Sequence, residues 1–234
     1  MVDLHTHVLP GIDDGSKSVE MSESMIKILK EQGVSTIFCT PHYYPTDISL
    51  SEFIKNRNMA YDKIKFLEQD VKLILGSETY ISEILFNHDS LTSLCIGNSD
   101  YLLLELPYER KWSKELFKNV ERIISKYDVI PIIAHVERYM PIQSKHKLIN
   151  EFIDMECLIQ MNAASIVDEH SRKFALKLIK KGYINFLGTD SHNLTTRKPL
   201  MSEAINIINE KLGNDYIEEF AENTNIFSNI KNTI

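Results

Sequence analysis

Asp3-Leu4-His5-Thr6-His7, followed by Leu9-Pro10-Gly11-Ile12-Asp13-Asp14-Gly15, is the stretch from which fold and chemistry can be worked out. Two histidines two positions apart lie on the same face of an extended strand, because side chains alternate with period two. Both imidazoles can therefore reach one metal ion. An isolated His-x-His pair is weak evidence for a metal site, so its interpretation depends on the other residues of the chain.

Length and composition indicate one folded unit. The chain has 234 residues, of which 43% are apolar, and single α/β barrels often reach this size. We therefore expect residues 1–234 to form a single domain with a large core. The formal net charge of −7 disfavours nonspecific binding of nucleic acid, and no nucleic-acid partner is expected.

The cysteines and the apolar runs of the sequence indicate the cellular compartment in which the protein is expected. Cys39, Cys95 and Cys157 show no C-x-x-C spacing, so neither a disulfide framework nor a thiolate zinc site is predicted. The chain opens without the basic start and apolar region of a signal peptide, and no apolar run is long enough to cross a bilayer. We expect a cytoplasmic protein without membrane insertion. The sequence leaves its oligomeric state open.

Short apolar runs alternate with amphipathic stretches, which indicates parallel strands joined by crossover helices. Seven strands are expected at Val2–His5, Thr36–Thr40, Lys72–Leu75, Tyr101–Leu104, Val129–Ala134, Cys157–Asn162 and Ile184–Gly188. Helices are expected at 16–31 (capped by Ser16 or Ser18), 51–69, 113–127, 145–155, 164–181, 201–211 and 216–222, with short helix and turn over 84–97. Seven strands favour a closed or nearly closed barrel over an open sheet.

The informative polar residues follow the strands. Six of the seven expected strands end on, or just before, a charged or imidazole side chain, namely His5 with His7, His42, Glu78, Glu105, His135 and Asp190. The C-terminal ends of barrel strands meet at one mouth, so these side chains should converge. His192 follows Asp190 by two residues, and Asp14 can reach the mouth from the first loop. Purely structural roles for the whole set are disfavoured.

Neutral nitrogen and carboxylate oxygen ligands without thiolate suit Mn²⁺, Fe²⁺ or Zn²⁺. Nine candidate ligands are too many for one ion and suit two or three. Adjacent ions can bind phosphate oxygens and generate a hydroxide nucleophile. The remaining histidines, His88, His146 and His170, fall outside the pattern and are expected at the surface.

At this point the sequence resembles the polymerase-and-histidinol-phosphatase (PHP) family of metal-dependent phosphoesterases, and more closely its bacterial protein-tyrosine-phosphatase branch linked to capsular and exopolysaccharide biosynthesis. The matching segments span nearly the whole chain: Asp3–His7, Gly11–Gly15, Thr40–His42, Gly76–Glu78, Leu104–Glu105, Ile133–Tyr139, and Thr189–Leu194 with Arg197. No ligand position of the family pattern is missing.

The resemblance implies a distorted (β/α)7 TIM-like barrel with three divalent metal ions, usually manganese, at the C-terminal strand ends. By the family pattern His5, His7, Glu78 and Asp190 hold one ion. Glu78 bridges to a second ion with Glu105 and His135, while Asp14, His42 and His192 hold the third. Arg138 and Arg197 match the phosphate-binding arginines of the family. Their position in expected mouth loops supports this role, because a guanidinium binds phosphate through two hydrogen bonds, although a surface salt bridge is the alternative.

We therefore expect hydrolysis of protein phosphotyrosine by a metal-activated hydroxide, with the phosphotyrosine tail of a bacterial tyrosine autokinase as the partner by resemblance. A cysteine phosphatase needs Cys and Arg six positions apart, and the residues six after the cysteines are Pro45, Tyr101 and Ala163. The alternatives are a small-molecule phosphatase, such as one for histidinol phosphate, a phosphodiesterase for DNA ends, and a non-catalytic phosphotyrosine-tail binder.

Aromatic and basic residues near the expected mouth are less informative. Tyr43, Tyr44 and Tyr80 flank expected ligands and are most simply rim or core residues, but Tyr43 or Tyr44 is a hypothetical wall for the substrate ring. The loop Arg110-Lys111-Trp112 could shape substrate access, although a solvated loop is the simpler interpretation.

Overall fold

Two parallel sheets form the centre of the molecule in a computed structural model, which describes residues 1–69, 71–107, 111–143 and 148–232. The first sheet has the order β1-β2-β4 and the second the order β3-β5-β6-β7-β8-β9. The strands are β1 (Val2–Thr6), β2 (Thr36–Cys39), β3 (His42–Tyr43), β4 (Lys72–Leu75), β5 (Glu78–Tyr80), β6 (Tyr101–Glu105), β7 (Ile130–Ile133), β8 (Leu158–Asn162) and β9 (Phe186–Gly188). The pairings between these strands are parallel.

Two of the expected strands are each followed, after a short break, by a further strand. β2 and β3 are separated at Thr40-Pro41, where proline has no N–H for the ladder. β4 and β5 are separated at Gly76-Ser77, where Arg57 Nη1 donates to the Gly76 carbonyl at 3.0 Å. Each break lets the chain leave one sheet and enter the other.

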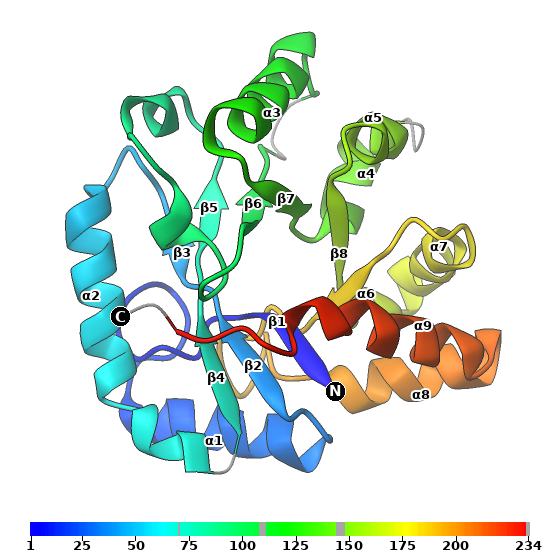
Figure 1. The fold of residues 1–234 in the computed structure, drawn as a ribbon. Coiled ribbons are helices and arrows are strands. Elements are labelled where there is room, and N and C mark those ends of the chain that lie inside the picture. The colour runs from blue at the N-terminus through cyan, green and yellow to red at the C-terminus, as the bar shows by residue number, and fades with distance from the viewer. Residues whose placement is uncertain (70, 108–110, 144–147, 233–234) are drawn as a thin grey trace.

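The sheets curl, and the helices surround them (Figure 1). β1 and the segment after β9 lie side by side. His7 N–H donates to Ser191 O at 3.0 Å, and Asp190 N–H donates to His5 O at 2.7 Å. The buried Asp3 carboxylate accepts the Thr189 backbone N–H at 2.8 Å and its hydroxyl at 2.6 Å. These hydrogen bonds connect β1 with the segment that follows β9.

The outer layer consists of helices that pack apolar faces on the sheets. They are α1 (Val19–Glu31), α2 (Leu50–Asp62), α3 (Lys114–Tyr127), α4 (Val136–Gln143), α5 (Leu148–Asp154), α6 (Ala163–Val167), α7 (Glu169–Lys180), α8 (Met201–Leu212) and α9 (Asp215–Asn223). Short 3₁₀-helices lie at Lys65–Gln69, Glu83–Asn87, Thr92–Leu94 and Thr224–Phe227. Ser18 caps α1 by accepting the Met21 N–H.

The helix predictions are correct in position and wrong in three details. The expected helix 51–69 ends as an α-helix at Asp62 and continues as 3₁₀ turns. The expected helix 164–181 is two helices, because the Asp168 side chain caps α7 by accepting the Ser171 N–H. α4 was not predicted, although it begins directly after His135. The expected start at Lys145 lies outside the described residues, as do Arg110 and His146.

Two apolar clusters hold the layers together. The larger lies between sheet and helices. The smaller lies inside the curl and takes one side chain from each of six strands: Leu4, Phe38, Ile74, Leu103, Ile132 and Phe186. Phe227 and Ile230, from the C-terminal segment, pack against it. This inner cluster fills the N-terminal half of the sheet interior and leaves the C-terminal half to polar residues.

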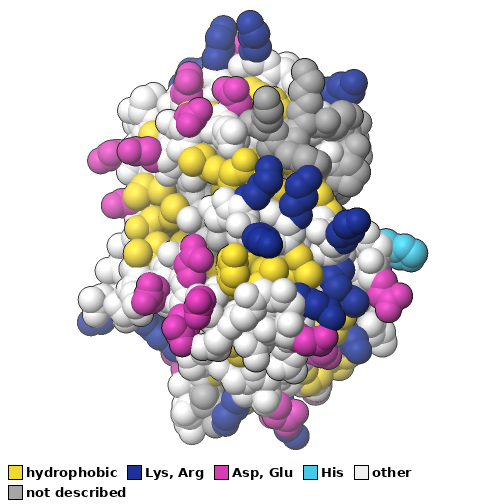
Figure 2. All heavy atoms as spheres, turned by 90° about the vertical axis from the view of Figure 1, so that its right-hand side faces the viewer, with side chains coloured by type: hydrophobic (Ala, Val, Ile, Leu, Met, Phe, Trp, Pro, Cys, Tyr) yellow, Lys and Arg dark blue, Asp and Glu magenta, His cyan; other side chains and the backbone are white. Residues whose placement is uncertain are grey.

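The outer surface is chemically mixed. From the side that carries α7 and α8, basic, acidic and hydrophobic side chains are interspersed (Figure 2). Within the described ranges, no helix is both long and apolar enough to pass through a membrane.

Candidate metal centre

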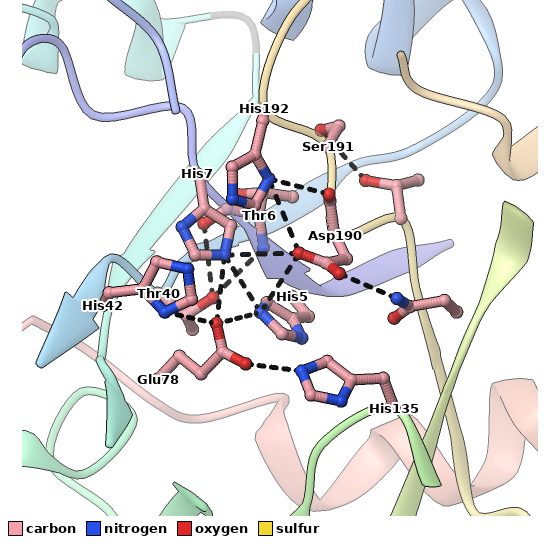
Figure 3. A network of polar contacts seen from close by, with 12 residues as sticks. His5, Thr6, His7, Thr40, His42, Glu78, His135, Asp190, Ser191 and His192 are labelled. Carbon is pink, nitrogen blue, oxygen red and sulfur yellow. Dashed lines mark hydrogen bonds and ion pairs between the residues drawn. The ribbon is translucent and has the colours of Figure 1, made fainter. Parts of the chain in front are cut away.

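The structure brings all nine predicted ligands together at the C-terminal ends of the strands, and Figure 3 labels seven of them. Two come from β1 and its continuation, two open the short strands β3 and β5, one ends β6, three follow β7 or β9, and one lies in the first loop. They are His5, His7, His42, Glu78, Glu105, His135, Asp190, His192 and Asp14. Asp14 and His42 reach solvent, whereas the other seven are buried.

Glu78 is the centre of the arrangement. Its Oε2 atom lies 3.0 Å from His5 Nε2, 3.2 Å from His7 Nε2 and 3.0 Å from His42 Nδ1. Its Oε1 atom lies 2.6 Å from His135 Nε2. One carboxylate thus contacts four imidazoles with its two oxygen atoms.

Asp190 and Asp14 gather the remaining groups. Asp190 Oδ1 lies 3.4 Å from His7 Nε2 and 3.7 Å from His5 Nε2. Asp14 Oδ1 lies 3.2 Å from His192 Nε2 and 3.5 Å from His42 Nε2. Three groups of donor atoms result, with the atoms of each within 4.8 Å of one another: His5-His7-Glu78-Asp190, His7-Asp14-His42-His192 and His42-Glu78-Glu105.

The donor atoms fit divalent cations. Glu78 Oε2, Glu105 Oε2 and His192 Nε2 are buried, and none of them makes a hydrogen bond of good geometry within the described part of the chain, although Glu78 Oε2 and His192 Nε2 have polar neighbours at 3.0–3.2 Å. Buried polar atoms without partners are costly unless an ion uses their lone pairs. Imidazole nitrogen with carboxylate oxygen is the donor set of Mn²⁺, Fe²⁺ and Zn²⁺ sites.

Burial and mutual charge shift the pKa values of the carboxylates in opposite directions. Burial would raise the pKa of Glu78, but the imidazoles, first His5 and then His42, hold it well below its usual range. Burial, together with the nearby Glu78 charge, raises the pKa of Glu105 to about 7. A cation close to both would favour the charged form of Glu105.

Hydrogen bonds also orient the imidazoles. His7 Nδ1 lies 2.7 Å from Asp13 Oδ2, and His192 Nδ1 lies 2.9 Å from the Asp190 carbonyl oxygen. An oxygen without a proton can only accept, so each Nδ1 donates and each Nε2 keeps its lone pair for the cluster. Asp13 was not predicted, although it stands beside Asp14 in the quoted loop.

Local backbone geometry positions these groups. His135 and Asp190 have positive φ values of 32° and 52°, a region that costs energy for residues with a side chain and is frequent at functional sites. Gly15 has a different reason: a Cβ there would lie 2.4 Å from His7 Cβ. Only glycine lets the first loop fold back against His7.

The two predicted arginines also lie at the site. Arg197 Nη2 lies 2.7 Å from Asp190 Oδ1, and Arg138 Nη1 lies 3.3 Å from Asp190 Oδ2. Their side chains are 35% and 39% exposed, so both guanidinium groups border the cluster and still reach solvent.

The other predictions near the mouth have mixed outcomes. Tyr43 as a wall for a substrate ring is wrong, because it is 1% exposed and packs on Phe53. Tyr44 is half-buried and stacks on His42 with ring centroids 5.1 Å apart. His88 is half-buried and its Nε2 lies 3.3 Å from Tyr43 Oη, whereas His170 is exposed as expected.

A curled parallel sheet with buried imidazoles and carboxylates at its strand ends defines a class: metal-dependent hydrolases that bind their ions at the mouth of an α/β fold. Comparison with known proteins then gives the particular family. The model of the capsular polysaccharide synthesis CpsB/CapC family matches residues 1–228, and the chain belongs to that family.

Named relatives and a solved structure agree with this membership. The tyrosine-protein phosphatase CpsB of Streptococcus agalactiae is 28% identical over 239 residues, which cover 95% of this chain and 96% of that protein. The tyrosine-protein phosphatase YwqE of Bacillus subtilis is 27% identical over 236 residues, covering 97% and 91%. A chain from the crystal structures of YwqE from Bacillus subtilis and CpsB from Streptococcus pneumoniae, described as metal-dependent tyrosine phosphatases, matches with a TM-score of 0.85 at 22% identity, covering 100% of this chain and 96% of that one.

Proposed function

We propose that this chain is a metal-dependent protein-tyrosine phosphatase that acts in capsule or exopolysaccharide synthesis. The main supporting observation is the position of Glu78, which contacts four imidazoles. Asp190, another of the nine residues, contacts both arginines. The names of the relatives and the family description support it.

For the fold, we propose one domain over residues 1–234 with the topology of a distorted (β/α)7 barrel. β2 with β3 and β4 with β5 then count as two interrupted strands, which gives seven strand positions. The hydrogen bonds between β1 and the segment after β9 support closure. The small second strands place His42 and Glu78 inside the mouth.

We propose that the nine residues hold three divalent ions, with manganese as the first candidate. The three donor groups correspond to the three ions, and His42 and Glu78 each belong to two groups. His135 completes the environment of Glu78. When bound, the ions would activate water and neutralise charge on phosphoryl oxygens.

The chain's own residues would orient the phosphate ester. Arg138 and Arg197 can each donate hydrogen bonds to non-bridging phosphoryl oxygens and stabilise their growing charge. Arg197 also lies 3.6 Å from Asp14 Oδ2, which keeps its guanidinium beside the cluster. The tyrosine leaving group has a pKa of about 10, so a strong general acid is less necessary than for an alkyl ester.

For the partner, we propose a phosphotyrosine segment of a protein, with the tail of a bacterial tyrosine autokinase as the first candidate. Half-exposed arginines at the rim support an external macromolecular substrate.

The three cysteines are free and buried, which fits a reducing compartment such as the cytoplasm.

The test is a substrate panel with metal depletion and add-back. Phosphotyrosyl peptide, phosphoseryl peptide, histidinol phosphate and 3′-phosphorylated DNA are each given to chelator-treated enzyme with and without Mn²⁺. The proposal expects Mn²⁺-dependent turnover with preference for phosphotyrosyl peptide. Full activity after chelation would contradict the metal mechanism, a preference for histidinol phosphate or DNA would contradict the substrate, and stoichiometric binding without phosphate release would indicate a binder.

A further inference from the structure

One buried pair of amides touches the proposed metal centre. Gln160 and Asn162 lie two residues apart on β8, which corresponds to the one expected strand that no charged or imidazole side chain follows. They are 0% and 6% exposed. We propose that they form a hydrogen-bonded relay that orients His5 and Asp190 and thereby sets the affinity for metal ions, an inference that rests on the proposed function of the same site.

The direction of the relay is fixed by its two ends. The backbone N–H of His135 can only donate, and it donates to Gln160 Oε1 at 2.7 Å. The amide nitrogen of Gln160 then donates to Asn162 Oδ1 at 3.0 Å. Asn162 Nδ2 donates to Asp190 Oδ2 at 2.8 Å, and an ionised carboxylate can only accept. Both amides therefore have one orientation that satisfies every partner.

The first amide also selects the tautomer of His5. Gln160 Oε1 lies 3.3 Å from His5 Nδ1. Because this oxygen carries no proton, the neutral imidazole keeps its hydrogen on Nδ1 and a free lone pair on Nε2. His5 Nε2 is the atom that lies 3.0 Å from Glu78 Oε2. The relay thus presents the correct nitrogen to the cluster, as partners of metal-binding histidines do.

The second amide fixes the carboxylate of Asp190. Asn162 and Arg138 hold Oδ2, which leaves Oδ1 toward the imidazoles. The neighbouring strand β9 packs closely against both residues, because a Cβ at Gly188 would lie 2.9 Å from Gln160 Nε2 and 2.6 Å from His5 Cβ. Both ends of the relay are therefore held in close packing.

The test replaces each amide with an apolar side chain of similar size, which adds no charge beside the cations. Gln160→Met removes the acceptor for His5 Nδ1 and the donor to Asn162. Asn162→Leu removes the donor to Asp190 Oδ2. Calorimetric titration with Mn²⁺ alone should show affinity about 10-fold to 100-fold weaker in each variant. Saturating Mn²⁺ should restore kcat, with KM for phosphotyrosyl peptide unchanged.

Gln32→Met is the matched control, because the Gln32 amide likewise bridges backbone groups, accepting from Met201 N–H and donating to the Pro199 carbonyl, but contacts none of the nine proposed ligands in these hydrogen bonds. It should bind Mn²⁺ as the wild type does. Unchanged affinity for Mn²⁺ in both relay variants would overturn the inference. It would also be overturned if excess Mn²⁺ did not restore kcat and the metal-free variants had a lower Tm, because the amides would then have a purely structural role. A wild-type chain that binds no Mn²⁺ would refute the proposed function itself.

Discussion

The interior of the curled sheet has an apolar half and a charged half, and the same strands supply both. β6 places Leu103 in the inner apolar cluster and, two residues later, Glu105 in the proposed metal centre. β1 likewise supplies Leu4 and then His5. Both strands therefore change from hydrophobic to ionisable over one or two residues as they reach the mouth.

The two halves differ in what they contribute to stability. Burial of the apolar side chains stabilises the fold directly. Burial of the carboxylates works against the charged form, since it raises the pKa of Glu105 to about 7, and buried charges rarely repay their desolvation. In the charged half the imidazoles offset this cost for Glu78, whose pKa lies well below its usual range, but not for Glu105. The predictions below separate these two roles.

The largest expected effect is loss of activity when the charge at the centre is removed. Glu78→Gln keeps the shape but weakens the contacts with the four imidazoles, so kcat/KM for phosphotyrosyl peptide should fall by at least about a thousandfold. The Tm of the metal-free protein should also fall, because the lowered pKa of Glu78 means that its charged form stabilises the folded chain. Glu83→Gln, at an exposed carboxylate, is the control and should leave both unchanged. Retained activity in Glu78→Gln would remove the bridging role.

In the apolar half we expect a large loss of stability without a change in the kinetics of the folded protein. Phe227 is 3% exposed and contacts the rings of Phe38, Tyr101 and Phe186. Phe227→Ala should lower the free energy of unfolding by about 3–5 kcal/mol, measured by urea denaturation, while KM stays the same. Phe66→Ala, at a 52% exposed ring, should cost far less. A changed KM in Phe227→Ala would show that the halves are not independent.

The charged half was also the easier half to locate from the sequence. His, Glu and Asp at the ends of apolar runs are conspicuous, and the rule that strand ends meet at one mouth places them together. The same reasoning could not find Gln160 and Asn162, because neutral amides inside an apolar run look like ordinary strand residues. Their role depends on partners from β7 and the segment after β9, which only the tertiary structure defines.

The fold was predictable in its order and less so in its breaks. Amphipathic spacing located the strands and most helices. The interruption between β4 and β5 depends on Arg57, which is distant in sequence and donates to Gly76 O. The positive φ of His135, after which α4 begins directly, likewise leaves no signature in hydrophobic periodicity.

A smaller loss is expected at the rim of the charged half. Arg197→Ala removes the contact of 2.7 Å to Asp190 and a proposed phosphate contact, so kcat/KM should fall about tenfold to a thousandfold. Arg138→Ala should act in the same direction. Arg122→Ala, at an exposed arginine that packs on Phe86, serves as the control. If both rim variants keep wild-type kcat/KM, the arginines are surface ion pairs only.

The smallest expected effect separates the two neighbouring tyrosines. Tyr44 stacks on His42 and lies 5.7 Å from the Tyr80 ring, so its ring can contact an aromatic substrate at the mouth. Loss of one such aromatic contact should raise KM about twofold to tenfold in Tyr44→Ala, because ring pairs contribute about 0.5–1.5 kcal/mol. Tyr44→Phe keeps the ring and should keep KM. Tyr43→Ala should instead lower the free energy of unfolding, because Tyr43 is buried on Phe53. The opposite result would contradict this assignment. If the folded Tyr43→Ala protein has a raised KM and Tyr44→Ala does not, Tyr43 belongs to the charged half and Tyr44 does not.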